Sequence, residues 1–228
     1  MLEKVKKTLK RFHMLRAGDR VLVAVSGGPD STALLHILWR LQGEMGLELL
    51  VFHLDHMLRG EESHRDACHV REMAASLGIP ALIKKFAVGK YRDKRGLSTQ
   101  QAARQVRYAL LGQVARREAC GKIALGHNQN DQVETILMRL IQGTGLQGLA
   151  GIPPVRPLAG AQIIRPLLEV TREEILAYCR KEDLQVRWDP SNKEPVYLRN
   201  KIRLQLLPLL EEYNPNFQEQ VAANAQLW

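Results

Sequence analysis

The sequence is poor in cysteine and has no long apolar run. Its three cysteines, Cys68, Cys120 and Cys179, are widely spaced and form no CxxC pair. A scattered, odd-numbered set does not build a disulfide framework, so we expect three reduced thiols. No apolar stretch approaches the roughly 18 residues needed to cross a bilayer, and the N-terminal MLEKVKKTLKRFHML is too charged for a secretory signal. The sequence therefore predicts a cytoplasmic protein with no membrane partner.

Acidic residues are scarce relative to basic ones. The 228 residues hold 24 Asp and Glu against 33 Lys and Arg, a net charge of +9. The excess lies entirely within residues 1–150 and is concentrated in 1–20 and 84–95. Such clusters suit a polyanion, whose binding would be salt-sensitive. A solvated basic surface that keeps the protein soluble is the alternative explanation.

Internal repeats and low-complexity segments are also missing. Short apolar runs alternate with longer amphipathic stretches, which predicts an α/β fold: a doubly wound, mainly parallel five-stranded sheet with helices on both faces. The predicted strands are 20–25, 48–54, 80–84, 122–126 and 162–165, and the main predicted helices are 30–42, 62–77, 99–119 and 130–142.

The segment 143–160 is rich in glycine and proline, so we expect a loop there. It divides the chain into a nucleotide-binding domain with a basic N-terminal helix (1–150) and a part with the fifth strand and a helical tail (151–228). Ser98 with Gln101, and Thr171 with Glu174, have the spacing of capping boxes that open helices.

The stretch VLVAVSGGPDS has the layout of a phosphate-binding loop between a strand and a helix, but it lacks the lysine of a Walker loop. Gly27 and Gly28 allow a tight turn, and Ser26 and Ser31 can add hydroxyl donors. Asp30 would repel phosphate unless a cation lay between them, so it predicts Mg²⁺. The alternative is an ordinary turn with an acid at a helix N-terminus.

SGGPDS resembles the SGGxDS loop of the N-type ATP pyrophosphatases (the PP-loop superfamily), which split ATP into AMP and pyrophosphate to adenylate a substrate. The resemblance implies an adenine nucleotide α hydrolase-like fold, with ATP and Mg²⁺ as cofactors and Asp30 as the metal contact. The ATP-binding residues expected at the loop and at neighbouring strand ends are Ser26, Gly27, Gly28, Pro29, Asp30, Ser31, Leu54, Asp55 and Gly126.

Two pairs of charged residues have helical i, i+3 spacing. Arg104 and Arg107 suit phosphates, or form a solvated basic face. Asp131 and Glu134 suit a second metal or a cationic substrate, or are acids favoured near a helix N-terminus. His127 precedes the second pair at a predicted strand end, and another polar cluster lies at Arg199, Asn200 and Arg203.

Five motifs, in order, resemble one family closely: SGGPDS, HLDHMLR, ARQVRY, GHNQNDQVET and DPSNKEPVYLRNKIR match tRNA(Ile)-lysidine synthetase from about residue 20 to 210. That family adenylates the C2 oxygen of cytidine 34 in the isoleucine tRNA with a CAU anticodon. Free L-lysine then displaces AMP and leaves lysidine. The resemblance implies a ligase that forms a carbon–nitrogen bond.

We expect the following roles on this resemblance. Asp30, Arg104 and His127 are catalytic, with His127 or the neighbouring acids assisting deprotonation of the lysine amine. Asp131 and Glu134 bind the cationic lysine. The tRNA-binding residues are Lys84, Lys85, Arg107, Arg199, Asn200 and Arg203.

Two rival functions are considered. A tRNA cytidine thiolase of the same superfamily would recruit paired cysteines or an iron–sulfur cluster, and a non-catalytic RNA-binding module would need no paired carboxylates. Members of the lysidine family often carry further C-terminal domains, so we expect either a catalytic-domain piece or a minimal form. The oligomeric state is left open, a homodimer being one option.

Overall fold

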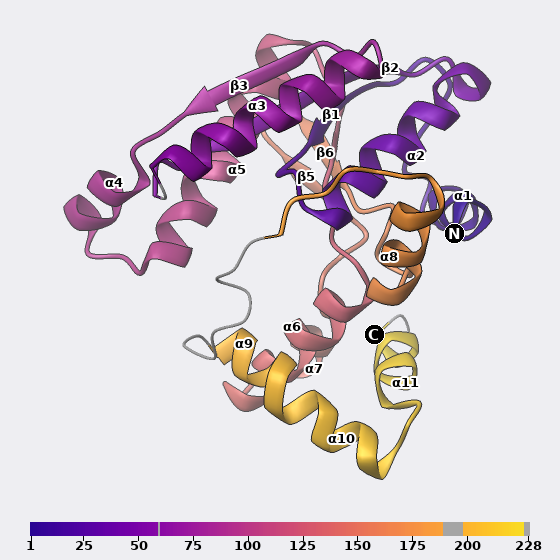
Figure 1. The fold of residues 1–228 in the computed structure, drawn as a ribbon. Helices are drawn as coiled ribbons and strands as arrows, with labels where there is room; N and C mark the ends of the chain where they lie inside the picture. Colours follow the sequence, from indigo (N-terminus) through magenta and orange to yellow (C-terminus); the bar gives the residue numbers. More distant parts are fainter. Residues whose placement is uncertain (59, 189–197, 226–228) are drawn as a thin grey trace.

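A computed structural model describes residues 1–58, 60–188 and 198–225 of the chain (Figure 1). Six strands form one sheet in the order β3-β2-β1-β4-β6-β5, in which every neighbouring pair is parallel except β5 and β6. The strands are β1 (Arg20–Ala24), β2 (Glu48–Asp55), β3 (Ala81–Lys85), β4 (Lys122–Ala124), β5 (Val155–Leu158) and β6 (Ala161–Ile164).

The five predicted strands and the α/β fold class are confirmed, and β5 is an additional strand. It lies inside 143–160, so the prediction of a structureless loop there was wrong; the short helix α7 (Leu146–Leu149) lies there as well. Ala159 and Gly160, with φ of 52° and 89°, make the tight turn of a β5–β6 hairpin. Pro157 is tolerated because β5 is an edge strand.

Helices cover both faces of the sheet (Figure 1). One apolar cluster joins α1, α2, α3 and α8 to the sheet, with Val21 and Val23 of β1 facing it, whereas Leu22 faces the opposite cluster with α4 and α5. This alternation is expected of a buried strand. The helices are α1 (Leu2–Arg11), α2 (Pro29–Met45), α3 (Glu61–Ser76), α4 (Val88–Arg95), α5 (Thr99–Arg117) and α8 (Arg172–Lys181).

The predicted C-terminal helical part is confirmed as a third, smaller apolar cluster. Val133 and Leu137 of one helix pack there against Ile202, Leu207 and Ala222. The elements that build it are α6 (Gln129–Ile141), a π-helical segment (Ile202–Leu206), α10 (Leu207–Tyr213) and α11 (Phe217–Asn224), and α9 (Leu198–Lys201) leads into the π-helical segment. The division at residue 150 stays a prediction.

Both predicted capping boxes are present. Gln101 N donates to Ser98 Oγ over 3.2 Å, and Glu174 N donates to Thr171 Oγ1 over the same distance. In the part of the chain that the structure describes, no helix is both long and apolar enough to span a membrane.

Candidate active site

The SGGPDS loop connects the C-terminal end of β1 to α2. Gly27 has a φ of +90°, a conformation that favours glycine, and Gly28 is the N-cap of the helix. Ser31 Oγ accepts a hydrogen bond from Ser26 N and donates one to Gly28 O, both over 3.1 Å. The loop is therefore held closed by its own second serine. The N-terminal N–H groups of α2 are left to favour an anion.

The loop lies at the point where the strand order of the sheet reverses. β1 has β2 on one side and β4 on the other, and parallel sheets bind ligands outside the carboxyl ends of such strands. A Cβ on Gly126, just after β4, would stand 3.1 Å from the carbonyl carbon of Asp30 and 3.2 Å from Ser31 N. Only glycine lets the end of β4 approach the start of α2 this closely.

Asp30 is fixed by two neighbours. Its Oδ1 accepts a hydrogen bond from Asn128 Nδ2 over 2.9 Å, and its Oδ2 lies 3.8 Å from Nη1 of Arg172. Burial raises the pKa of Asp30, the hydrogen bond from Asn128 lowers it in part, and the charge of Asp131 raises it further. A bound cation would offset this cost of burying the carboxylate.

Asp30 fits the expected Mg²⁺, which takes carboxylate and phosphate oxygens together. No group of three or more His, Cys, Asp or Glu that could hold a metal occurs among the described residues. Mg²⁺ at Asp30 would accordingly depend on phosphate and water for its other ligands.

Two adjoining hollows, of about 290 and 380 Å³, meet at the loop. They share Ser26, Gly28, Asp30, Asp131 and Arg199. The smaller has apolar walls from Phe52, Leu54 and Leu125, as a base would need, and also contains Ser31, Gly126, His127 and Arg107. The larger is polar and contains Pro29, Arg172, Arg187, Asn200 and Arg203. Most of the predicted site residues are thus brought together.

The acids and arginines expected to bind different substrates are bonded to one another. Arg199 reaches Asp131 Oδ1 over 2.8 Å and Glu134 Oε2 over 2.6 Å, and Arg203 Nε reaches Glu134 Oε1 over 2.6 Å. The Glu134 side chain is completely buried. Asp131 also accepts from Asn128 N in the capping box of α6. These ion pairs join α6 to α9 and the π-helical segment.

His127 is bonded to Arg165, which follows β6. Arg165 Nε donates to His127 Nδ1 over 3.2 Å, and its Nη1 donates to the carbonyl oxygen of Pro153. Burial lowers the pKa of His127 well below its usual value, and the charges of Arg165, Arg107 and others lower it further. Neutral His127 is therefore the resting form.

Besides Gly27 and the enclosed Glu134, four predicted residues lie outside both hollows. Asp55 is buried and its Oδ1 accepts from Met57 N, which stabilises the turn after β2. Lys84 and Lys85 end β3, beside Leu54 and Asp55 in the sheet. Arg104 is exposed on α5, with its guanidinium 4.9 Å from the ring centre of Tyr108. Arg59 of HLDHMLR and residues 189–197, which include DPSN, fall outside the described residues.

Sequence reasoning missed four polar residues of the site: Asn128, Arg165, Arg172 and Arg187. Asn128 carried a signal, because Asn with Asp three residues later is a capping pattern. Arg187 N donates to Gly27 O, and its side chain is bonded to Asp66. Nothing local distinguishes these three arginines from surface arginines, since their partners are far away in sequence.

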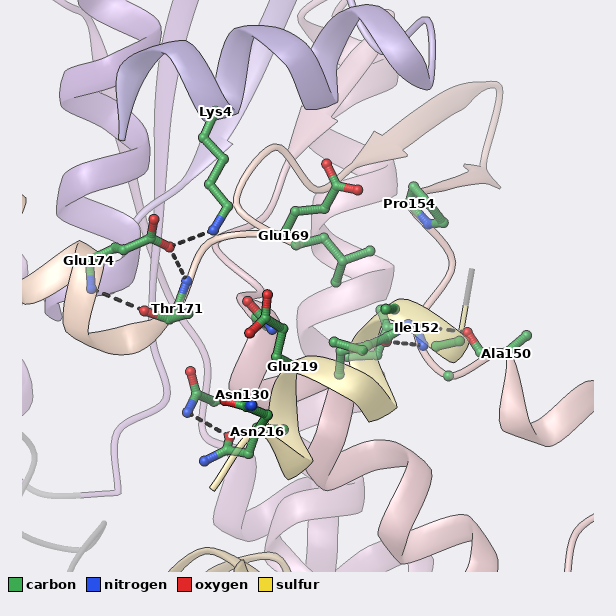
Figure 2. A pocket seen from close by; sticks show the side chains of 18 of the residues that line it. Lys4, Asn130, Ala150, Ile152, Pro154, Glu169, Thr171, Glu174, Asn216 and Glu219 are labelled. Carbon is green, nitrogen blue, oxygen red and sulfur yellow. Dashed lines mark hydrogen bonds and ion pairs between the residues drawn. The ribbon is translucent and has the colours of Figure 1, made fainter. Parts of the chain in front are cut away.

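The largest hollow, of about 1120 Å³, lies elsewhere, between α1, α6, α8 and α11 (Figure 2). It contains no predicted site residue and is rimmed by glutamates, among them Glu169, Glu174 and Glu219. Lys4 bonds Glu174 over 2.8 Å at its edge. An acidic rim does not suit phosphates, so the hollows at the loop are the better candidate site.

Comparison with known proteins agrees with this placement. A model of the PP-loop domain family matches residues 1–210. A tRNA(Ile)-lysidine synthase from Symbiobacterium thermophilum is 49% identical over 212 residues, covering 93% of this chain and 44% of that protein. One from Dehalococcoides mccartyi is 44% identical over 230 residues, covering 99% and 49%. The chain spans about half the length of these relatives.

Among solved structures, the U34-tRNA thiolase NcsA from Methanococcus maripaludis with its [4Fe-4S] cluster has a TM-score of 0.80 at 20% identity, covering 99% of this chain and 76% of that one. This likeness concerns the fold and supports the expected adenine nucleotide α hydrolase-like architecture. With the family model matching residues 1–210 and its loop seated at the β1–β4 strand ends, the chain belongs to the PP-loop family of ATP-binding domains.

Proposed function

We propose that the chain is the catalytic PP-loop part of a tRNA(Ile)-lysidine synthase. The observation that carries this proposal is the name shared by relatives 41–49% identical over 93–99% of the chain. The reaction would adenylate the C2 oxygen of cytidine 34 in the CAU-anticodon isoleucine tRNA and release pyrophosphate. The ε-amino group of free L-lysine would then form the new carbon–nitrogen bond and release AMP. Both substrates place the enzyme in the cytoplasm.

The loop residues would bind and orient the nucleotide. Ser26, Gly27, Gly28 and Ser31 would hold the phosphates through N–H and hydroxyl groups, with the base in the smaller hollow between Leu54 and Gly126. Mg²⁺ at Asp30 would neutralise the pyrophosphate that leaves. Asn128 would keep the Asp30 carboxylate in position.

For lysine, Asp131 is the better placed of the two proposed acids because it lines both hollows. Glu134 is enclosed by Arg199 and Arg203, so an ammonium group would reach it only after these arginines had moved. Glu134 in this arrangement positions the arginines. Arg199, Asn200 and Arg203 open onto the larger hollow, where they would meet the anticodon strand, with Arg107, Lys84 and Lys85 further along the RNA.

The thiolase alternative is disfavoured by the positions of the thiols. Cys68 lies near His64 Nε2 in α3, whereas the thiols of Cys120 and Cys179 are directed at backbone carbonyls of other segments. Burial raises the pKa of the Cys179 thiol to about 11, with the Asp30 charge contributing. The cysteine beside the loop is therefore protonated at neutral pH and a poor sulfur carrier.

Pyrophosphate release tests the proposal. The chain is incubated with ATP and Mg²⁺, with and without labelled lysine and an unmodified CAU-anticodon isoleucine tRNA transcript. We expect release that requires the tRNA, with label entering the RNA. Release without label would leave adenylation but contradict lysine as the nucleophile. Nucleotide binding without release would favour the RNA-binding module. A methionine tRNA transcript with the same anticodon is the substrate control.

A further inference from the structure

His127 and Arg165 come from neighbouring strand ends and form one unit. Arg165 is 2% exposed. Its guanidinium donates to His127 Nδ1 and Pro153 O and is also bonded to the Tyr108 hydroxyl. With three partners around a planar group, Arg165 has little freedom to turn. The position of the His127 ring is set by a buried, immobile cation.

The chemistry of arginine decides which nitrogen of His127 carries the proton. A guanidinium has only N–H donors and no acceptor. His127 Nδ1 must accept from Arg165 Nε and is therefore unprotonated. The proton of the neutral imidazole then lies on Nε2. Nε2 has no hydrogen-bond partner among the described residues, and His127 lines the smaller hollow together with Asp30 and Ser31.

The charges around His127 oppose its protonation. Arg104 and Arg107 of α5, Arg165 after β6 and Arg199 of α9 all lower its pKa, in addition to burial. The opposing groups in the same hollow are the carboxylates Asp30 and Asp131, beside His56. Arg165 itself has no carboxylate partner among the described residues, which favours an anionic ligand nearby.

We propose that Arg165 is a positioning residue that holds His127 as its neutral Nε2–H tautomer, so that His127 donates a hydrogen bond to a phosphate oxygen of the bound nucleotide. This role replaces the one expected from sequence, in which His127 assists deprotonation of lysine. A neutral imidazole whose Nδ1 is engaged and whose Nε2 bears a proton has no free basic nitrogen. The donor would stabilise charge that develops when pyrophosphate leaves. The choice of nucleotide rests on the proposed function, whereas the tautomer does not.

The tautomer is measurable without tRNA or lysine. The chain is labelled with ¹⁵N-histidine, and long-range ¹H–¹⁵N spectra are recorded from about pH 5 to pH 8. His127→Gln assigns the resonances. We expect a protonated Nε2 and an unprotonated Nδ1 throughout, with the Nε2 proton shifting when ATP and Mg²⁺ are added. A protonated Nδ1, or no response to Mg²⁺-ATP, would overturn the proposal.

Variants at Arg165 separate positioning from folding. Arg165→Met should mix the two tautomers and move the titration of His127 to higher pH, while Arg165→Lys, which keeps a charged donor, should restore the Nε2–H form. Arg139→Met is the matched control, because Arg139 also donates to buried backbone carbonyls, those of Gly148 and Gly151, away from the site. In turnover, Arg165→Met should lower kcat about tenfold or more with the KM for lysine unchanged.

The two possible failures give different results. A chain that shows the expected tautomer and the nucleotide response but never releases pyrophosphate would refute the proposed function and leave the Arg165–His127 pair intact. A chain that makes lysidine but shows an unchanged tautomer in Arg165→Met would refute the pair alone. If Arg165→Met fails to fold, the spectra of the unaltered chain still decide the tautomer.

Discussion

Asn128 donates from Nδ2 to Oδ1 of Asp30 over 2.9 Å, across 98 positions of sequence. The same side chain accepts from Asp131 N and so caps α6. One buried amide thus links the carboxylate of the phosphate loop to the helix that carries the acidic pair. The geometry of the loop and the placement of α6 are coupled through it.

Asn128→Ser separates these two functions of the amide. Serine is a good N-cap but too short to replace the donor at Asp30, so we expect near-normal stability and a higher Mg²⁺ concentration for half-maximal pyrophosphate release. Asn128→Ala loses the cap as well and should unfold more easily by about 1 kcal/mol more in urea. An unchanged Mg²⁺ requirement in Asn128→Ser would contradict the coupling.

Gly126→Ala should abolish nucleotide binding while the sheet remains folded. Its new Cβ would stand 3.1 Å from the Asp30 carbonyl carbon, forcing the end of β4 away from the loop. Gly121→Ala is the matched control, because no atom lies within 4 Å of a Cβ at that position. Binding of a fluorescent ATP analogue measures both, and tight binding by Gly126→Ala would show that the loop tolerates the displacement.

Asp30→Asn should stabilise the chain at neutral pH and abolish pyrophosphate release. Burial raises the pKa of Asp30 in the folded state above its unfolded value. Its contribution to stability is therefore present below the unfolded-state pKa and lost as the pH rises through the folded-state pKa. The gain in Tm from Asp30→Asn, without Mg²⁺ or nucleotide, should be largest near pH 7 and vanish toward about pH 4.

Glu212→Gln, at an exposed position of α10, is the control for removing one negative charge. Equal melting temperatures of Asp30→Asn and the unaltered chain at neutral pH would show that burial does not strain the carboxylate.

The double variant Lys84→Ala, Lys85→Ala should weaken tRNA binding because two ammonium groups no longer face the RNA phosphates. Each phosphate that is no longer neutralised should reduce the slope of log K against log salt by about 0.7–0.9. The double variant Arg180→Ala, Lys181→Ala removes two exposed charges at the far end of α8 and should leave the slope unchanged. Filter binding over a salt series measures both. Equal slopes for the two variants would place the RNA away from β3.

Residues close together in sequence determined much of this protein. The alternation of apolar runs and amphipathic stretches was enough for five strands and their helices, because side-chain periodicity is a local property. Gly27, Gly28 and Asp30 lie within one short turn, so their motif could indicate the phosphate site before any fold was known. The capping boxes at Ser98 and Thr171 were visible for the same reason.

Only the tertiary structure decided which charges meet. Glu134 bonds Arg199 and Arg203 across 65 and 69 positions, and Arg165 reaches His127 across 38. No periodicity encodes such pairs, because they depend on how α6, α9 and the sheet edges pack. β5 was missed for the same reason: a proline-containing segment becomes a strand only when β6 offers it an edge. Local sequence determined the elements and the phosphate loop, and long-range packing determined the charge and tautomer of the groups around it.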